Sequence, residues 1–288
     1  MTGESGTAKK AVLITGCSSG IGRETAIRAA EKDWIVFAGV RRDADAANLR
    51  ALKIPGLFPI CPLDLTNLEH ISGAAQKVAD ELNRRGIPGL RALVNNAGGG
   101  KPAPIELIRL DDFRRELEAR LLGSVAMVQS FLPLIRQAKG RIVWIMTPAL
   151  IPTPYVASIH ACDFAVNCIS RTLDIELKRW GIPNIMIKCG GIKTPAGLRT
   201  VSDVEACLHD GPYEPVGLYE KALRGWAKSM EKFDEKRTDA GQVADVVLKA
   251  LSAARPRRRY SIGYMSRAAV FLEALPQSLA DRILKSRF

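Results

Sequence analysis

The sequence predicts an α/β protein built as a single domain around a doubly wound, seven-stranded parallel sheet, with a small helical lid at one side. Three observations lead to this fold class. The 288 residues are 47% hydrophobic and 25% charged, which suits a globular chain with a large core. Short apolar runs alternate with longer helical patterns, as in successive βαβ units. The alternation is not broken by a linker rich in Gly, Ser or Pro.

Seven short runs rich in β-branched and apolar residues are predicted strands. Most of them are apolar throughout, which is typical of strands buried on both faces of a parallel sheet. The predicted strands are Ala11 to Ile14, Ile35 to Val40, Leu57 to Ile60, Arg91 to Val94, Arg141 to Met146, Ile185 to Lys188 and Tyr260 to Ile262.

Helices are predicted between these strands, where apolar residues recur at helical spacing. They cover Ile21 to Lys32, Leu68 to Arg84, Asp111 to Arg136, Ser158 to Trp180 and Ala240 to Ser252. The segment Ser202 to Lys236 is also helical in pattern but stands outside the alternation. We expect it to form a lid or wall that spans about residues 195–237.

The two ends of the chain differ from the body. Residues 1–9 are small and polar, without a signal-like apolar core, and are expected to form a disordered tail that precedes the domain at 10–288. Residues 264–288 form an amphipathic segment with basic residues. That pattern allows at most peripheral membrane contact, and packing on the body or on a second copy is the favoured interpretation.

Charge and cysteine usage limit the classes of partner. The formal charge of +12 raises nucleic acid as a partner, but basic residues are spread along the chain, so we expect no nucleic-acid binding. The six cysteines lack C-x-x-C pairs, and no His, Cys or carboxylate cluster has metal-ligand spacing. These features predict a cytoplasmic protein with reduced thiols and no metal.

A glycine-rich turn follows the first predicted strand and opens directly into a helix. Its sequence is Thr15-Gly16-Cys17-Ser18-Ser19-Gly20-Ile21-Gly22. Three glycines at this spacing let the backbone turn tightly and approach a pyrophosphate, which is stabilised by the N-terminal end of the helix. The context predicts a Rossmann-type dinucleotide site.

The turn and three later segments, in the same order, resemble the short-chain dehydrogenase/reductase family. Asn95-Asn96-Ala97-Gly98 resembles the segment that flanks the adenine ring, and Asp64, followed by Leu65, resembles the acidic residue that contacts the adenine amine. Gly190-Gly191-Ile192-Lys193-Thr194 is similar to the segment that holds the nicotinamide. The resemblance implies these cofactor-binding residues: Gly16, Cys17, Ser18, Ser19, Gly20, Ile21, Gly22, Asp64, Leu65, Asn96, Ala97, Gly98, Gly190, Ile192 and Thr194.

The end of the second strand indicates which nicotinamide cofactor binds. An acidic residue there would bind the ribose 2′-hydroxyl of NAD and repel a phosphate. This chain has Arg41 and Arg42 instead. Two permanently charged, planar guanidinium groups suit a 2′-phosphate, so the predicted cofactor is NADPH/NADP+.

The positions that would correspond to the family's catalytic Asn, Ser, Tyr and Lys carry other residues. An ungapped comparison from Thr153 to Val166 places Ile159 at the Tyr position and Asp163 at the Lys position. The Ser position falls at Met146, or at Thr147 if the loop is one residue shorter, and Arg120 replaces the Asn. We expect Arg120 and Asp163 to face each other across the site.

Two alternative proton donors stay open. A shifted comparison places Tyr155 in the catalytic Tyr position but moves the following helix by four residues. His160 adjoins the lost Tyr, but as a helical neighbour its side chain points about 100° away.

The altered site leads to three hypotheses about function. An iminium already carries positive charge, so its reduction needs no proton donor and gains from a carboxylate such as Asp163. The first hypothesis is therefore reduction of an imine or iminium in a bulky hydrophobic substrate, with Asp163, Arg120 and Thr147 as candidate catalytic residues. The lost Tyr and Lys resemble the reductase/Diels-Alderases of fungal indole alkaloid biosynthesis, which implies a coupled intramolecular [4+2] cyclisation.

The second hypothesis is a carbonyl reductase that uses Tyr155 or Thr147, and the third is a non-catalytic NADPH-binding protein, in which Arg120 and Asp163 form only a structural ion pair. The family resemblance also implies a homodimer or homotetramer formed through the helices at 111–136 and 158–180.

Overall fold

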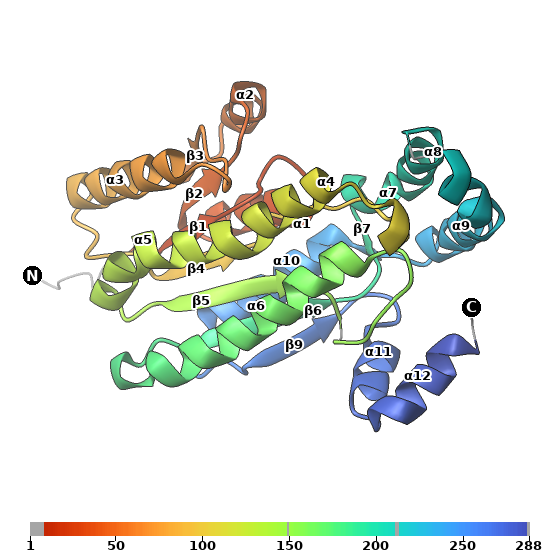
Figure 1. Cartoon of the computed structure of the whole chain (residues 1–288). Coiled ribbons are helices and arrows are strands. Elements are labelled where there is room, and N and C mark those ends of the chain that lie inside the picture. The colour runs from red at the N-terminus through yellow and green to blue at the C-terminus, as the bar shows by residue number, and fades with distance from the viewer. Residues whose placement is uncertain (1–8, 149, 211–212, 287–288) are drawn as a thin grey trace, which may run out of the picture.

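The computed structural model describes residues 9–148, 150–210 and 213–286, and a seven-stranded parallel sheet lies at its centre (Figure 1). The strand order is β3-β2-β1-β4-β5-β6-β9. Strands β1 to β3 are added toward one edge of the sheet and β4, β5, β6 and β9 toward the other, so the winding reverses between β1 and β4. This reversal is the switch point at which ligands bind in doubly wound sheets. The strands are β1 (Ala11–Ile14), β2 (Ile35–Gly39), β3 (Leu57–Ile60), β4 (Ala92–Asn95), β5 (Arg141–Met146), β6 (Asn184–Cys189) and β9 (Arg259–Ile262).

Helices cover both faces of the sheet, and each face has its own apolar core. Alternate residues of β1 are buried in the two different cores, because successive side chains of a strand point to opposite faces of the sheet. Val12 and Ile14 pack with α1 (Gly20–Ala30), α2 (Asp43–Ala51) and α10 (Ala240–Ser252). Ala11 and Leu13 belong to the core that includes α3 (Leu68–Arg84), α5 (Gly123–Gln137) and α6 (Ala157–Glu176).

Most predicted boundaries agree with the structure to within two residues. The strands at β1, β3 and β5 and the helices α3 and α10 match exactly, and all seven predicted strands form. The helix α2 was not predicted, because only Ala46 and Leu49 of its nine residues are buried and the apolar periodicity is weak.

The predicted helix Asp111 to Arg136 was wrong as one continuous helix. It consists of α4 (Leu110–Glu116), a π-helical segment (Leu117–Leu122) and α5. The wider π turn shifts which side chains share a face, and such segments often occur at functional sites. The predicted helix Ser158 to Trp180 similarly ends at Glu176 and continues as a 3₁₀ turn, Lys178–Trp180.

The segment outside the alternation forms three helices next to the carboxyl end of the sheet, on the right of Figure 1. These helices are α7 (Pro195–Leu198), α8 (Thr200–Asp210) and α9 (Tyr213–Asp234). Two short strands, β7 (Ile192–Lys193) before them in the sequence and β8 (Thr238–Asp239) after them, pair in parallel. Val204, Leu223 and Trp226 form a third apolar core with Leu107, from the 3₁₀ turn Ile105–Leu107. We call α7 to α9 the lid.

The C-terminal segment forms two short helices, α11 (Ser266–Glu273) and α12 (Gln277–Lys285), beside the last strand (Figure 1). Lys188 of β6 is 2% exposed, and its Nζ donates hydrogen bonds to the Glu273 carboxylate at 2.9 and 2.6 Å. This buried ion pair fastens α11 to the sheet. Residues 1–8 of the predicted N-terminal tail lie outside the described residues.

In the described part of the chain, no helix has both the length and the apolar character needed to cross a bilayer.

Candidate active site

The glycine turn lies at the carboxyl end of β1 and leads into α1, as predicted. Gly16 and Gly20 have φ values of +71° and +58°, in the left-handed region that favours glycine. A side chain on Gly22 would collide with the carbonyl of Gly16. Ser19 is the N-cap of α1 but makes no side-chain capping bond in the described structure. The helix end therefore presents open N–H groups beside a backbone that can approach a pyrophosphate.

The segment after β4 holds this turn in place. The Asn96 side chain donates hydrogen bonds to the carbonyls of Thr15 and Gly16 at 2.8 and 3.2 Å. The backbone N–H groups of Asn96 and Ala97 both donate to the Thr15 hydroxyl, at 3.0 and 2.9 Å. Asn96 and Ala97 therefore position the turn from the neighbouring strand, whatever ligand they also contact.

The two arginines after β2 have different surroundings. Arg42 donates two hydrogen bonds to the Asp45 carboxylate, at 2.8 and 2.9 Å. Arg41 is exposed and forms no ion pair within the described residues. The predicted pair of equivalent phosphate ligands is thus divided: Arg41 is free to bind an anion, and Arg42 is engaged with its own helix.

Asp64 lies near this end of the sheet and keeps its charge. Burial opposes ionisation, but two hydrogen bonds from Thr66 and the charge of Arg41 outweigh it and lower the pKa of Asp64. Its neighbour Leu65 is 6% exposed and packs in the core, as does Cys17, whose thiol pKa is raised by burial. Cys17 and Leu65 can therefore offer a ligand only their backbone.

The segment after β6 closes the other side of the glycine turn. A Cβ atom added to Gly20 would lie 3.2 Å from Thr194 Cγ2. These two predicted cofactor-binding residues are therefore adjacent. The Thr194 hydroxyl accepts a hydrogen bond from Gly197 N at 3.1 Å and caps α7. Ile192 is buried, and Gly190 lies against the carbonyl of Tyr264 with no room for a side chain. The glycine turn, Asn96 to Gly98 and Thr194 together fit a dinucleotide.

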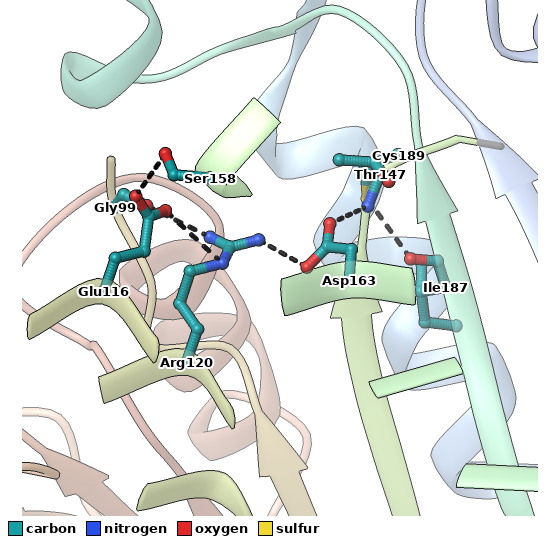
Figure 2. Close-up of polar contacts among 8 residues, drawn as sticks. All are labelled: Gly99, Glu116, Arg120, Thr147, Ser158, Asp163, Ile187 and Cys189. Atoms are coloured by element: carbon teal, nitrogen blue, oxygen red, sulfur yellow. Dashed lines mark hydrogen bonds and ion pairs between the residues drawn. The ribbon is translucent and has the colours of Figure 1, made fainter. Parts of the chain in front are cut away.

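Arg120 and Asp163 meet beside this cradle, as the sequence predicted (Figure 2). Arg120 Nη2 donates to Asp163 Oδ1 at 2.5 Å, and the two side chains are 15% and 4% exposed. Burial acts to lower the pKa of Arg120, but the Asp163 and Glu116 carboxylates outweigh burial and raise it. The Arg120 guanidinium therefore keeps its charge, and the pair is largely shielded from water.

Thr147 adjoins the same carboxylate. Its backbone N–H donates to Asp163 Oδ2 at 2.7 Å, so both Asp163 oxygens are held. The Thr147 hydroxyl is buried without a hydrogen-bond partner among the described residues. Met146, the other candidate for the Ser position, is 3% exposed at the end of β5.

Glu116 is a member of the cluster that the sequence analysis missed. Glu116 Oε2 accepts a hydrogen bond from the Ser158 hydroxyl at 2.9 Å, and Oε1 lies 3.8 Å from Arg120 Nε (Figure 2). Burial raises the pKa of Glu116, although Arg120 and Ser158 act in the opposite direction. Its spacing of four residues from Arg120 on one predicted helix was the available signal.

The alternative donors lie in less suitable positions. Tyr155 precedes α6 with a φ of +66°, and its ring packs edge to face on Trp226 of the lid, 5.6 Å between centroids. His160 Nδ1 lies 2.9 Å from the Ile151 carbonyl, and burial lowers the pKa of its ring. The contact of Asp163 with Arg120 favours the ungapped comparison, because the shifted one moves Asp163 away from the Lys position.

Comparisons with known proteins agree with a dinucleotide-binding oxidoreductase. The family model for short chain dehydrogenases matches residues 10–204. The chain is 30% identical to a 3-amino-tetrahydro-pyrrolizinone reductase from Xenorhabdus hominickii, covering 88% of this chain and 87% of the relative. It is 31% identical to retinol dehydrogenase 16 from Homo sapiens, covering 96% and 87% respectively.

Solved structures show the same fold. A short-chain dehydrogenase from Streptomyces avermitilis superposes with a TM-score of 0.75 at 22% identity, covering 98% of both chains. Another from Burkholderia cenocepacia, in complex with NADP, gives a TM-score of 0.72 at 22% identity, covering 96% of this chain and 98% of that one.

The fold and the cradle define the class, a Rossmann-type NAD(P)-dependent oxidoreductase. Within that class, this chain belongs to the short-chain dehydrogenase family.

Proposed function

We propose that this protein is an NADPH-dependent reductase of an imine or iminium in a bulky hydrophobic substrate. The observation that carries the proposal is the buried ion pair of Arg120 and Asp163 beside the cofactor cradle. NADPH, when bound, supplies the hydride. The preference for NADPH over NADH is supported by Arg41, which stands free at the end of β2 where a 2′-phosphate is recognised in this fold.

The chemistry of an iminium matches the groups that are present. Hydride addition to its carbon moves the C=N π electrons onto nitrogen and neutralises the positive charge, so no proton is transferred. A ketone would instead develop negative charge on oxygen and need a donor. Ile159 and Met146 cannot donate a proton, whereas a polar cluster that contains the Asp163 carboxylate can orient a cation. Arg120 and the N–H of Thr147 hold Asp163 in position.

An apolar lid that contacts Tyr155, four residues before Ile159, supports a bulky substrate. The lid core includes Leu107, Leu223 and Trp226, with Tyr155 packed against it. One relative is named as a reductase of an amino-substituted pyrrolizinone, a nitrogen heterocycle, and this name agrees with a nitrogen-containing substrate class.

A coupled intramolecular [4+2] cyclisation is an extension of this proposal. Asp163 would act as a base that takes a proton from one carbon of the reduced substrate and returns it at another, so that the C=C bonds shift and a diene tautomer forms. Both of its oxygens already accept hydrogen bonds, so one of these would have to be given up. Product analysis by mass and chirality would detect this step separately from NADPH consumption.

A carbonyl reductase is the second candidate, and one observation favours it. The Thr147 hydroxyl is buried and unpartnered in the described structure, so it is available to a substrate oxygen. Thr147→Val should abolish ketone reduction if this candidate holds and leave iminium reduction within a few-fold of wild type if it does not.

The decisive experiment follows NADPH absorbance with cyclic iminium salts and with ketones of similar size. Asp163→Asn removes the charge and keeps the shape, so iminium turnover should fall by about 100-fold or more while NADPH affinity stays within about threefold. Glu176→Gln, an exposed carboxylate on the same helix, is the control and should behave like wild type. An Asp163→Asn variant that reduces iminium salts at the parental rate would refute the role of Asp163.

A protein that binds NADPH but consumes none with either substrate class would support the non-catalytic hypothesis instead.

A further inference from the structure

The charges around Asp163 do not yet explain how the site would attract a cation. Asp163 and Arg120 carry opposite unit charges at 2.5 Å, so at any longer distance they largely cancel. A substrate cation would meet a dipole and would gain little from Asp163 alone. A net negative charge needs a second anion within the same buried cluster.

Glu116 is in the position to supply it. Its carboxylate lies on the opposite side of the Arg120 guanidinium from Asp163, as Figure 2 shows. The Glu116 side chain is 7% exposed, and its Oε1 is buried without a hydrogen-bond partner in the described residues. The separation of 3.8 Å from Arg120 Nε leaves that oxygen incompletely satisfied.

The free oxygen of Glu116 lies toward the place where the family's Tyr would stand. A Cβ on Gly100 would collide with Glu116 Oε1 and would lie 2.5 Å from Ile159 Cγ1. Gly100 therefore passes directly over both side chains, and only a glycine leaves room there. Gly98 passes over Arg120 in the same way. The loop after β4 is thus shaped around the Glu116 and Arg120 side chains.

We infer that Glu116 gives this cluster its net negative charge and thereby selects a cationic substrate over a neutral one. The inference rests on the proposed function, because it explains how the cluster of Arg120 and Asp163 would recognise an iminium. With Glu116 ionised, two carboxylates flank one guanidinium and the cluster carries one net negative charge. With Glu116 protonated, the cluster is neutral. Glu116 is a specificity-determining residue in this scheme.

The pH dependence follows from the burial of Glu116. Burial raises its pKa, so the neutral cluster persists to a higher pH than for an exposed Glu, and the negative cluster forms above that pH. Cation affinity should therefore rise with pH. Cys162 on α6 also faces Glu116, but burial raises its thiol pKa to about 11, and it stays neutral. His160 protonates only at acid pH, because burial lowers its pKa.

The test is equilibrium binding to the NADP+ complex, in which no hydride is available. The probe is the 2-methyl-3,4-dihydroisoquinolinium cation, and its uncharged counterpart is 2-methyl-3,4-dihydroisoquinolin-1-one. Both are titrated by calorimetry at a series of pH values from about pH 5, just above the ordinary pKa of Glu, to about pH 8. Wild type should bind the cation about tenfold more tightly at the upper end, the size of one partly shielded charge interaction, with no such change for the lactam.

In Glu116→Gln, the affinity for the cation should no longer rise with pH. At about pH 8 this variant should bind the cation about tenfold more weakly than wild type, and its affinity for the lactam should be unchanged. Glu118→Gln removes an exposed carboxylate from the adjoining π-helical segment, two residues away, and is the control, which should match wild type. Glu116→Asp keeps the charge and should keep the preference for the cation.

Unfolding measurements separate this role from a structural one. Because the folded protein holds the Glu116 proton more tightly than the unfolded chain, ionising Glu116 costs stability as the pH rises through its raised pKa. Glu116→Gln should therefore unfold at or above the wild-type temperature at neutral pH.

A wild-type cation-to-lactam affinity ratio that does not change with pH would overturn the inference without any variant. An unchanged cation affinity in Glu116→Gln would do the same. A pH-dependent preference in a protein that fails to reduce the cation with NADPH would uphold the role of Glu116 and refute the reductase.

Discussion

At the residue scale, the functional assignment depends on which charged side chains are satisfied by neighbours and which are free. Arg42 and Asp45 satisfy each other, whereas Arg41 forms no ion pair in the described structure. Asp163 is held by Arg120 and by the N–H of Thr147, and Glu116 has one free oxygen. Arg41 is therefore available to a ligand, whereas the paired groups hold one another in position.

Arg41 provides the first residue-scale prediction. Arg41→Asp replaces a cation by an anion where the 2′-phosphate of NADPH is expected, so NADPH affinity should fall by about 100-fold or more, and NADH affinity should change little. Fluorescence titration with each cofactor measures this. Arg42→Asp is the matched control and should cost less, because Arg42 is already paired with Asp45. Equal losses for NADPH and NADH in Arg41→Asp would rule out the assignment.

At the element scale, irregular backbone positions the site. The π-helical segment Leu117–Leu122 interrupts the helix from Leu110 to Gln137 where Glu116 and Arg120 meet α6. The loop after β4 crosses these side chains through Gly98 and Gly100. Both features depart from ideal geometry exactly at the polar cluster, which is common at functional sites.

The attachment of α11 can be tested by its ion pair. Glu273→Gln should lower the free energy of unfolding by about 2 kcal/mol, because Lys188 would be left buried without its counter-charge. Urea denaturation followed by circular dichroism measures this. Combining Lys188→Met with Glu273→Gln should recover most of the loss, because no unpaired charge remains. Wild-type stability in Glu273→Gln would show that α11 is held by other contacts.

At the scale of the whole molecule, the exposed surface of α6 is the expected contact between copies. Phe164, Cys168 and Ile175 are exposed on this helix, with Ile175 at 77%, and the family resemblance implies a homo-oligomer formed here. Spacings of four and seven residues place the three side chains on one side of the helix. Large apolar side chains in this exposed position are typical of an interface.

Ile175→Glu should therefore convert the oligomer to a monomer. Sedimentation velocity at micromolar concentration measures the state, and Leu218→Glu on the lid, at a residue 79% exposed, is the control that should leave it unchanged. A wild-type monomer under these conditions would refute the expected oligomer.

The sequence by itself determined the features that depend on local pattern. Apolar runs and helical periodicity identified all seven strands of the central sheet and five of the helices that cover it, because both signals repeat within a few residues. The glycine turn was equally local, since Gly16, Gly20 and Gly22 are needed for backbone geometry within one short segment. The contact of Arg120 with Asp163 followed from comparison with family positions.

Only the tertiary structure decided the features that depend on contacts distant in sequence. Ser158 and Glu116, which share a hydrogen bond, are 42 residues apart. No local pattern specifies a contact over such a distance, and the π-helical segment Leu117–Leu122 leaves no clear periodic signal. Three further features also depend on tertiary contacts. Arg42 is paired while Arg41 is not, Tyr155 packs on Trp226 of the lid, and Lys188 forms a buried ion pair with Glu273. Burial and pairing set the charge of each group, and both exist only once the chain has folded.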